Sequence, residues 1–211
     1  MSVSPLQPHS FVLASKSASR RAMLDALGLA YESIPADINE RALETEMEGA
    51  PAEEIAQALA VAKAADVART HGDAIVLGSD SLVEVEGRRF DKPASREDAA
   101  SHLRFFSGKT IQLHSAAALM RGEQVLWVGH DRAALSVRDL SEEFIAAYLD
   151  VEWPEVGYCV GVFRIEALGP HLFESIRGDQ FTVLGMPLLQ VLEALREEGV
   201  VARWASVPMP R

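Results

Sequence analysis

The chain has 211 residues, a formal net charge of −11 at pH 7, and 48% hydrophobic and 24% charged residues. This composition can bury one sizeable core, so we expect a single globular domain over 1–211, with 1–9 flexible. The acidic balance argues against binding to nucleic acid polymers or acidic membranes, which require a basic face. No apolar run approaches the roughly 18 residues of a membrane span, and no secretory signal pattern opens the sequence, so we expect a cytoplasmic protein with no membrane partner.

Cysteine and histidine usage narrows the metal chemistry. The single cysteine, Cys159, excludes an internal disulfide and a Cys-cluster zinc site. The six histidines show no H-x-H or H-x-x-x-H spacing, so we expect no metal site built from histidine. Any metal would then be held by carboxylates, phosphates and water.

Hydrophobic periodicity and turn residues predict strands and helices that alternate within one α/β unit. In chain order the expected elements are a strand at 10–14, a helix at 18–27, a strand at 31–34, an acidic stretch, an Ala-rich helix at 51–70, two β-type runs within 74–93, a helix at 95–107, a hairpin of 110–120 and 124–137, a helix at 140–150, strand-like or irregular chain at 157–173, and a helix at 187–198. Ser17 or Ser19 is expected to cap the first helix, and Ser95 with Asp98 resembles a capping box.

The segment LASKSASRRAMLDALG joins the first strand to a helix whose first turn carries Arg20 and Arg21. Cations at a helix N-terminus oppose the macrodipole, so helix stability does not explain them. A bound anion would make the arginines favourable at this position. Free backbone N–H groups, serine hydroxyls and one or both arginines would then hold a phosphate. The alternative is that both arginines point to solvent or pair with acids elsewhere.

Asp80 interrupts the apolar run AIVLGSDSLVEV. A carboxylate buried in a strand is costly unless it is paired or holds a metal, although a buried Asp that accepts hydrogen bonds from a loop is the plainer alternative. Strand alternation directs Ser79 and Ser81 to the opposite side from Asp80. Lys92 follows a turn that could return it beside Asp80, and a carboxylate next to an ammonium suits phosphate chemistry.

Weaker candidates lie in three other segments. Glu40 closes the short DINE segment, and Lys63 is the only basic residue of its helix before Arg69; by themselves both are more readily interpreted as solvated charges. Glu166 lies between apolar neighbours and is as readily placed at the surface as inward. The FSGKT stretch is not a P-loop, because Leu103 stands where that motif requires glycine.

Taken in order, these segments resemble the Maf family of nucleotide pyrophosphatases, once described as septum-formation inhibitors, over roughly 11–199. The resemblance is carried by LASKSASR, DINE, GSD, the K-P dipeptide, FSG and IRGDQFTVLGMPL. It places the family's site residues on Ser15, Arg20, Glu40, Lys63, Asp80 and Lys92.

The resemblance implies an α/β fold with a mixed β-sheet flanked by helices, in two lobes around a central cleft as in Maf and ITPase-like proteins, and a possible homodimer. It also implies hydrolysis of the α–β phosphoanhydride of a nucleoside triphosphate to the monophosphate and pyrophosphate, aided by a divalent cation, Mg²⁺ or Mn²⁺. Asp80 would activate water or hold the metal together with Glu40. The cationic side chains that would neutralise the phosphates are Arg20, Lys63 and Lys92.

The preferred nucleobase stays open, because the three marker residues that distinguish the branches of the family do not agree. Ser19 and Ser81 match neither the branch acting on dTTP and UTP nor the branch acting on 7-methyl-GTP, whereas Glu166 leans to the second. We expect all three to line the substrate site. The rival interpretation is a nucleotide-binding regulator of cell division without turnover, and a phosphatase releasing single phosphates ranks last because SDSLV is not a D-x-D motif.

Overall fold

The computed structural model of the chain describes residue 7 and residues 9–203. The flexibility expected for 1–9 therefore concerns residues that mostly lie outside the described ranges. Gln7 is described and is held firmly: its side chain is buried, accepts a hydrogen bond from the backbone N–H of Ala30 at 2.6 Å and donates one to the carbonyl of Ala30 at 2.7 Å.

A single mixed sheet of seven strands organises the described chain, in the order β2-β1-β3-β5-β6-β7, with β4 paired to β3. The strands are β1 Phe11–Leu13, β2 Tyr31–Ser33, β3 Ile75–Val85, β4 Arg88–Phe90, β5 Thr110–Arg121, β6 Gln124–Val137 and β7 Phe173–Arg177. Strands β2, β1 and β3 are parallel, and all other pairings are antiparallel. The predicted hairpin is confirmed as β5 and β6.

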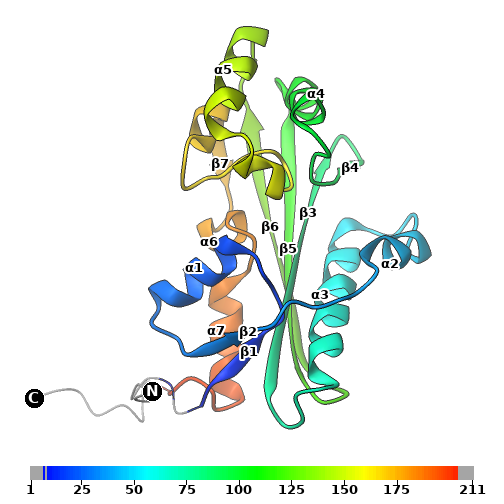
Figure 1. The fold of residues 1–211 in the computed structure, drawn as a ribbon, viewed down its shortest axis with the longest axis vertical. Coiled ribbons are helices and arrows are strands. Elements are labelled where there is room, and N and C mark those ends of the chain that lie inside the picture. The colour runs from blue at the N-terminus through cyan, green and yellow to red at the C-terminus, as the bar shows by residue number, and fades with distance from the viewer. Residues whose placement is uncertain (1–6, 8, 204–211) are drawn as a thin grey trace, which may run out of the picture.

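Helices cover both faces of this sheet. They are α1 Ala18–Ala26, α2 Glu40–Glu46, α3 Ala52–Ala68, α4 Arg96–Phe106, α5 Glu142–Glu152, α6 Gln180–Val183 and α7 Leu188–Glu197, with short 3₁₀ turns η1 Glu155–Tyr158 and η2 Gly169–Leu172. In Figure 1, α1 and α7 lie on one side of the lower half of the sheet and α3 on the other, while α4 and α5 lie at the upper end. The predicted mixed sheet flanked by helices is confirmed. None of the described helices combines the length and apolar character that a membrane crossing needs.

Strand alternation divides the apolar residues between the two faces. Leu77 and Leu119 pack with α1 and α7, whereas Val76 and Met120 pack against α3. Leu82 itself packs with Leu59 of α3, and beyond it a more aromatic cluster joins the upper ends of the strands to α4 and α5. The polar residues at the middle of β3 therefore lie where the lower clusters end and the upper one begins.

Several local predictions need correction. Ser17 occupies the N-cap position of α1 but makes no side-chain capping bond; its hydroxyl lies 3.1 Å from that of Ser19 instead. The acidic stretch contains a helix, α2, capped by the side chain of Asn39, which the sequence interpretation missed. For 157–173, the irregular alternative is confirmed, because this segment forms 3₁₀ turns and loops and the strand begins only at Phe173. Ser95 caps α4 as predicted, although Asp98 bonds the N–H of Ala94, one residue earlier than in a capping box.

Candidate active site

The predicted site residues gather where the parallel part of the sheet ends. Ser15 lies two residues after β1, Glu40 begins the helix after β2, and Asp80 lies midway along β3 between them and the antiparallel half. Open α/β sheets bind ligands outside the carboxyl ends of their parallel strands. The topology thus brings together residues up to 65 positions apart in the chain, because β1 and β3 are neighbouring strands.

Asp80, Lys63 and Glu40 form a chain of ion pairs on the α3 face of the sheet. The ammonium Nζ of Lys63 lies 2.5 Å from Oδ1 of Asp80 and 3.0 Å from Oε1 of Glu40. The side chains of Asp80 and Lys63 are 9% and 13% exposed, whereas that of Glu40 is 50% exposed. The interpretation as a solvated charge is therefore wrong for Lys63, whereas Glu40 is both paired and exposed, so the cluster opens toward solvent there.

Close packing of α3 onto β3 produces this contact. A methyl group added at Gly78 would meet the backbone oxygen of Ala60 at 2.1 Å and the backbone nitrogen of Ala64 at 2.7 Å. Only a residue without Cβ allows the helix backbone to approach that closely. Lys63 follows Ala60 by one turn, so the glycine two residues before Asp80 sets how far the Lys63 side chain reaches.

Arg20 occupies the opposite face of β3. Its guanidinium donates to the carbonyls of Ser79 and Gly185, both at 2.9 Å. Further hydrogen bonds link Nη2 to Oγ of Ser81 at 3.1 Å and Nη1 to Oγ of Ser15 at 3.4 Å. Four of the five N–H groups of a guanidinium are thus engaged by neutral oxygens.

This arrangement contradicts the alternative in which Arg20 points to solvent or pairs with an acid, while its contact with a phosphate stays a prediction. The residue is only 9% exposed, so its side chain does not point to solvent, and no described acid pairs with it directly. Burial lowers the pKa of Arg20, while the negative charges of Asp80 and Glu40 act in the opposite direction. Arg20 therefore carries a positive charge within the field of the Asp80 cluster while its hydrogen bonds tie α1 to β3 and to the loop at Gly185. Arg21, by contrast, is exposed.

The N-terminus of α1 is open for an anion. No side chain caps it and no acid lies in its first turn. Ser15 Oγ accepts hydrogen bonds from the N–H of Ser17 at 3.2 Å and from Nη1 of Arg20 at 3.4 Å. Helix N–H groups left without an acceptor, together with the helix dipole, favour a phosphate. The failure of Ser17 to cap the helix is consistent with an anion taking that place.

Of the marker serines, Ser81 contacts the Arg20 guanidinium and Ser19 does not. Ser81 is held by Arg20, by the carbonyl of Gly185 at 3.0 Å and by Ser115, whose hydroxyl is 3.1 Å away. The predicted separation of Ser79 and Ser81 from Asp80 across the sheet is confirmed, because both serines contact Gly185 while Asp80 contacts α3. Ser19 lies in the first turn of α1, beside Ser17.

Lys92 and Glu166 lie apart from the Asp80 cluster. The pairing of β3 with β4 ends where Phe90 lies opposite Val83, so the chain leaves the sheet before Lys92. Both residues are exposed, and neither makes an ion pair with a described residue. Their charges act in opposite directions on the thiol of Cys159, whose pKa burial raises to about 11, so they share one neighbourhood next to η1.

Gly185 and Ser115 belong to this site, and the sequence interpretation missed both. The carbonyl of Gly185 accepts bonds from Arg20, Ser79 and Ser81, and its φ of +104° favours glycine. The LGMP turn signalled a bend but not a carbonyl directed at β3. Ser115 pairs with Ser81 across β3 and β5 and donates to the carbonyl of Thr182 at 2.9 Å, a contact that requires the strand register.

Histidines do gather, contrary to the expectation drawn from their spacing. His114 on β5 and His130 on β6 place their ring nitrogens 3.3 Å apart, and Glu53 of α3 completes a set of three side chains whose ligand atoms lie within 4.8 Å of one another. This set is the only such group of three or more among the described residues. At Asp80, by contrast, only two carboxylates are available.

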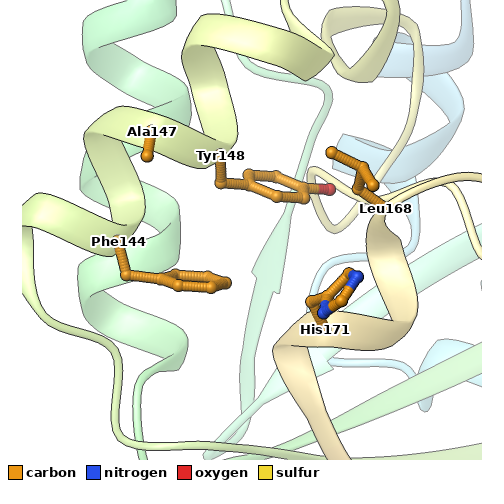
Figure 2. Close-up of a pocket in the computed structure, with 5 residues that line it drawn as sticks. All are labelled: Phe144, Ala147, Tyr148, Leu168 and His171. Atoms are coloured by element: carbon orange, nitrogen blue, oxygen red, sulfur yellow. The ribbon is translucent and has the colours of Figure 1, made fainter.

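The apolar pocket in Figure 2 lies at the upper end of the molecule, away from Asp80. It is lined by Phe144, Ala147, Tyr148, Leu168 and His171 and measures ≈ 200 Å³. That volume is below the roughly 300–1,000 Å³ of most small-molecule sites. The hydroxyl of Tyr148 donates to the carbonyl of Val162 at 3.1 Å, so the pocket offers little polar chemistry.

A mixed α/β sheet with an open helix N-terminus beside a buried Asp–Lys pair defines a phosphate-handling class of protein. The model of the family described as Maf-like protein matches residues 10–198, and the chain belongs to that family. It is 45% identical to nucleoside triphosphate pyrophosphatase 1 of Jannaschia sp. (strain CCS1) over 90% of this chain and 98% of that protein. It is 44% identical to the 7-methyl-GTP pyrophosphatase of Rhizobium meliloti (strain 1021), over 90% and 96%.

Among solved structures, the Ham1 protein of Staphylococcus aureus has a similar fold. The TM-score is 0.50 and the sequence identity 15%, over 90% of this chain and 100% of that one. At this identity the similarity concerns the fold alone, and it agrees with the mixed sheet that the sequence predicted.

Proposed function

We propose that the chain hydrolyses nucleoside triphosphates to the monophosphate and pyrophosphate. The observation that carries this proposal is the Asp80–Lys63–Glu40 chain of ion pairs at the carboxyl ends of the parallel strands, next to the uncapped α1. Family membership and the names of the relatives support the same reaction. Nothing in the fold or in the relatives favours a regulator without turnover.

In this proposal the triphosphate binds against the first turn of α1. Ser15, Ser19 and the free N–H groups hold one phosphate, and Lys63 exchanges part of its contact with the carboxylates for the phosphate oxygens. Lys92, which no described acid pairs, moves onto the outer phosphates and stabilises the leaving pyrophosphate. Asp80 accepts a proton from a water molecule, the resulting hydroxide attacks the α-phosphorus, and the α–β bond breaks.

A divalent cation, Mg²⁺ or Mn²⁺, fits the donor set at Asp80 and Glu40. Lys63 contacts one oxygen of each carboxylate, Oδ1 of Asp80 and Oε1 of Glu40, which leaves the second oxygen of each for a metal. Magnesium binds one or two carboxylates and completes its shell with substrate phosphates and water. When bound, the cation would neutralise phosphate charge and lower the pKa of a coordinated water.

Arg20 acts in this proposal mainly as a positioning residue. Its donors are engaged internally, so it fixes the loop of Ser15 relative to β3 and adds a buried positive charge near the phosphates. Ser81 is equally engaged and would reach the substrate only through that network. Glu166 remains the candidate for contacting the base, because its carboxylate is exposed and accepts hydrogen bonds from N–H donors. A homodimer stays a prediction, to be checked by light scattering in solution.

The test uses a panel of canonical and methylated triphosphates with Mg²⁺ or Mn²⁺, in water enriched in ¹⁸O. Pyrophosphate as product, with the label in the monophosphate, is expected, because water attacks the α-phosphorus. Label in the pyrophosphate would place the attack on the β-phosphorus and contradict the proposed reaction. Absence of turnover on every substrate would favour the regulator, and the substrate turned over fastest would identify the base.

Chelation tests the cation separately. Dialysis against a chelator should abolish turnover, and Mg²⁺ or Mn²⁺ should restore it. Full activity in excess chelator would remove the cation from the proposal.

A further inference from the structure

Glu53, His114 and His130 lie on the same face of the sheet as Asp80. His114 is on β5, the neighbour of β3, His130 is on β6, one strand further, and Glu53 is on α3, which covers this face. Asp80 is paired with Ala116, and Ala116 with His130, so the backbones of Asp80 and His130 lie roughly 10 Å apart. His114 is two residues before Ala116 on β5 and points to the same face by alternation. Glu53 lies in the first turn of α3, at the N-terminal end of this helix.

The spacing of the two imidazoles suits a tetrahedral metal. Nδ1 of His114 and Nε2 of His130 are 3.3 Å apart, and the rings stack with their centroids 5.4 Å apart. Two nitrogens bound to one Zn²⁺ at about 2.0–2.1 Å with a tetrahedral angle lie about 3.3 Å apart. The same distance also fits a hydrogen bond between two neutral rings, so the distance alone does not decide between them.

The surroundings favour a cation over a bare histidine pair. Burial lowers the pKa of both histidines, so both imidazoles are neutral near pH 7 and each offers a lone pair. The charged groups acting on the pair are three carboxylates, Glu53, Glu84 and Asp131, and one guanidinium, Arg132. His114 is buried, while His130 is half-buried and Glu53 exposed, which leaves a path for entry and lets Glu53 change rotamer toward a metal.

We propose that Glu53, His114 and His130 bind one divalent transition-metal ion of the Zn²⁺ type, with water as the fourth ligand. Two imidazoles and a carboxylate are a donor set that suits Zn²⁺ and neighbouring transition metals rather than Mg²⁺. The bound ion would tie the first turn of α3 to the β5–β6 hairpin. Because α3 also carries Lys63, the ion would hold that helix against the sheet. The proposal does not depend on the reaction assigned to Asp80.

The test titrates untagged, metal-free full-length protein with ZnCl₂ in the absence of nucleotide, by calorimetry. One Zn²⁺ per chain is expected, together with a rise in thermal unfolding temperature, because the ion binds only the folded chain. CoCl₂ as a second probe should give the visible absorption of four-coordinate Co²⁺. No binding of either metal would overturn the proposal.

Matched variants locate the site. Glu53→Gln and His130→Gln change exposed or half-buried side chains, so both variants should fold. Each should weaken Zn²⁺ binding by more than about 10-fold, since even the loss of a residue that only orients a metal ligand costs about that much. His171→Gln, which changes an exposed histidine of η2 outside this set, and Asp80→Asn should bind Zn²⁺ as the parent does. Parent-like affinity in both site variants, or loss of the ion in Asp80→Asn, would contradict this site.

Discussion

Ser79, Asp80 and Ser81 are consecutive, yet they serve two different polar networks on opposite faces of one strand. On the α3 face, Asp80 shares one ammonium with Glu40, and the cluster opens to solvent. On the α1 face, Arg20 is enclosed by carbonyls and hydroxyls. The first network consists of charges that can exchange partners when a phosphate arrives. The second has nearly all its donors satisfied and therefore resists rearrangement.

Buried charge is the reason for this difference. Unsatisfied buried groups cost about 1–3 kcal/mol each, so a buried guanidinium persists only where acceptors surround it. The Asp80–Lys63 pair is also nearly buried, but Lys63 continues to Glu40 at the solvent, so the charges of this network can exchange partners without being left unpaired. We expect substitutions on the α3 face to affect turnover and those on the α1 face to affect folding first.

Asp80→Asn should give the largest effect, a fall in kcat of about 10²–10⁴-fold, which is the usual contribution of a general base. The free energy of unfolding should change little, because Asn can still accept a hydrogen bond from Lys63. Steady-state kinetics and chemical denaturation measure the two quantities. Asp73→Asn, an exposed acid just before β3, is the control and should behave as the parent. Equal turnover by the Asp80 variant and the parent would remove Asp80 from the reaction.

Arg20→Ala should mainly lower stability, the opposite of what we expect for Asp80→Asn. Unfolding free energy should fall by about 1–3 kcal/mol for each buried acceptor left without a partner. Turnover should fall and KM should rise as the Ser15 loop loosens. Arg20→Lys should not restore stability, because one ammonium cannot reproduce the planar set of bonds to Ser79, Ser81 and Gly185. Parent-like stability with a raised KM alone would instead make Arg20 a direct phosphate ligand.

Gly78→Ala links the two networks through packing. The added methyl would overlap the backbone of Ala60, so α3 must move away, at a cost of about 1–3 kcal/mol. Lys63 would move with the helix, and turnover should fall although no charged group has changed. Unchanged activity in Gly78→Ala would show that the Lys63–Asp80 distance matters little.

We expect the smallest effect on the reactivity of the Cys159 thiol, which tests whether Lys92 and Glu166 lie near it. Because burial raises the pKa of this thiol from 9.0 to about 11, the thiolate fraction near pH 8 is roughly 100-fold below that of a free thiol. Iodoacetamide alkylation should therefore be slow and accelerate as pH rises toward 11. Glu166→Gln should speed it by lowering the pKa, and Lys92→Ala should slow it by raising the pKa. No change in either variant would separate these residues from Cys159.

The sequence by itself determined most of the elements. Period-two and helical patterns identified the hairpin, the Ala-rich helix and the apolar run containing Asp80, because these signals are local. It also selected Asp80 as a charge that must be paired, and the ordered motifs suggested Lys63 and Glu40. Helix α2 was missed because its charged sequence shows no apolar face, and none of its residues is buried.

Only the tertiary structure decided which partners these residues take. Lys63 reaches Asp80 because α3 packs directly on Gly78, and Arg20 finds the carbonyl of Gly185, 165 residues away. His114 and His130 meet through the register of β5 and β6, which includes a bulge between Leu119 and Met120. Such contacts depend on strand register and interhelical distance, and sequence spacing carries neither.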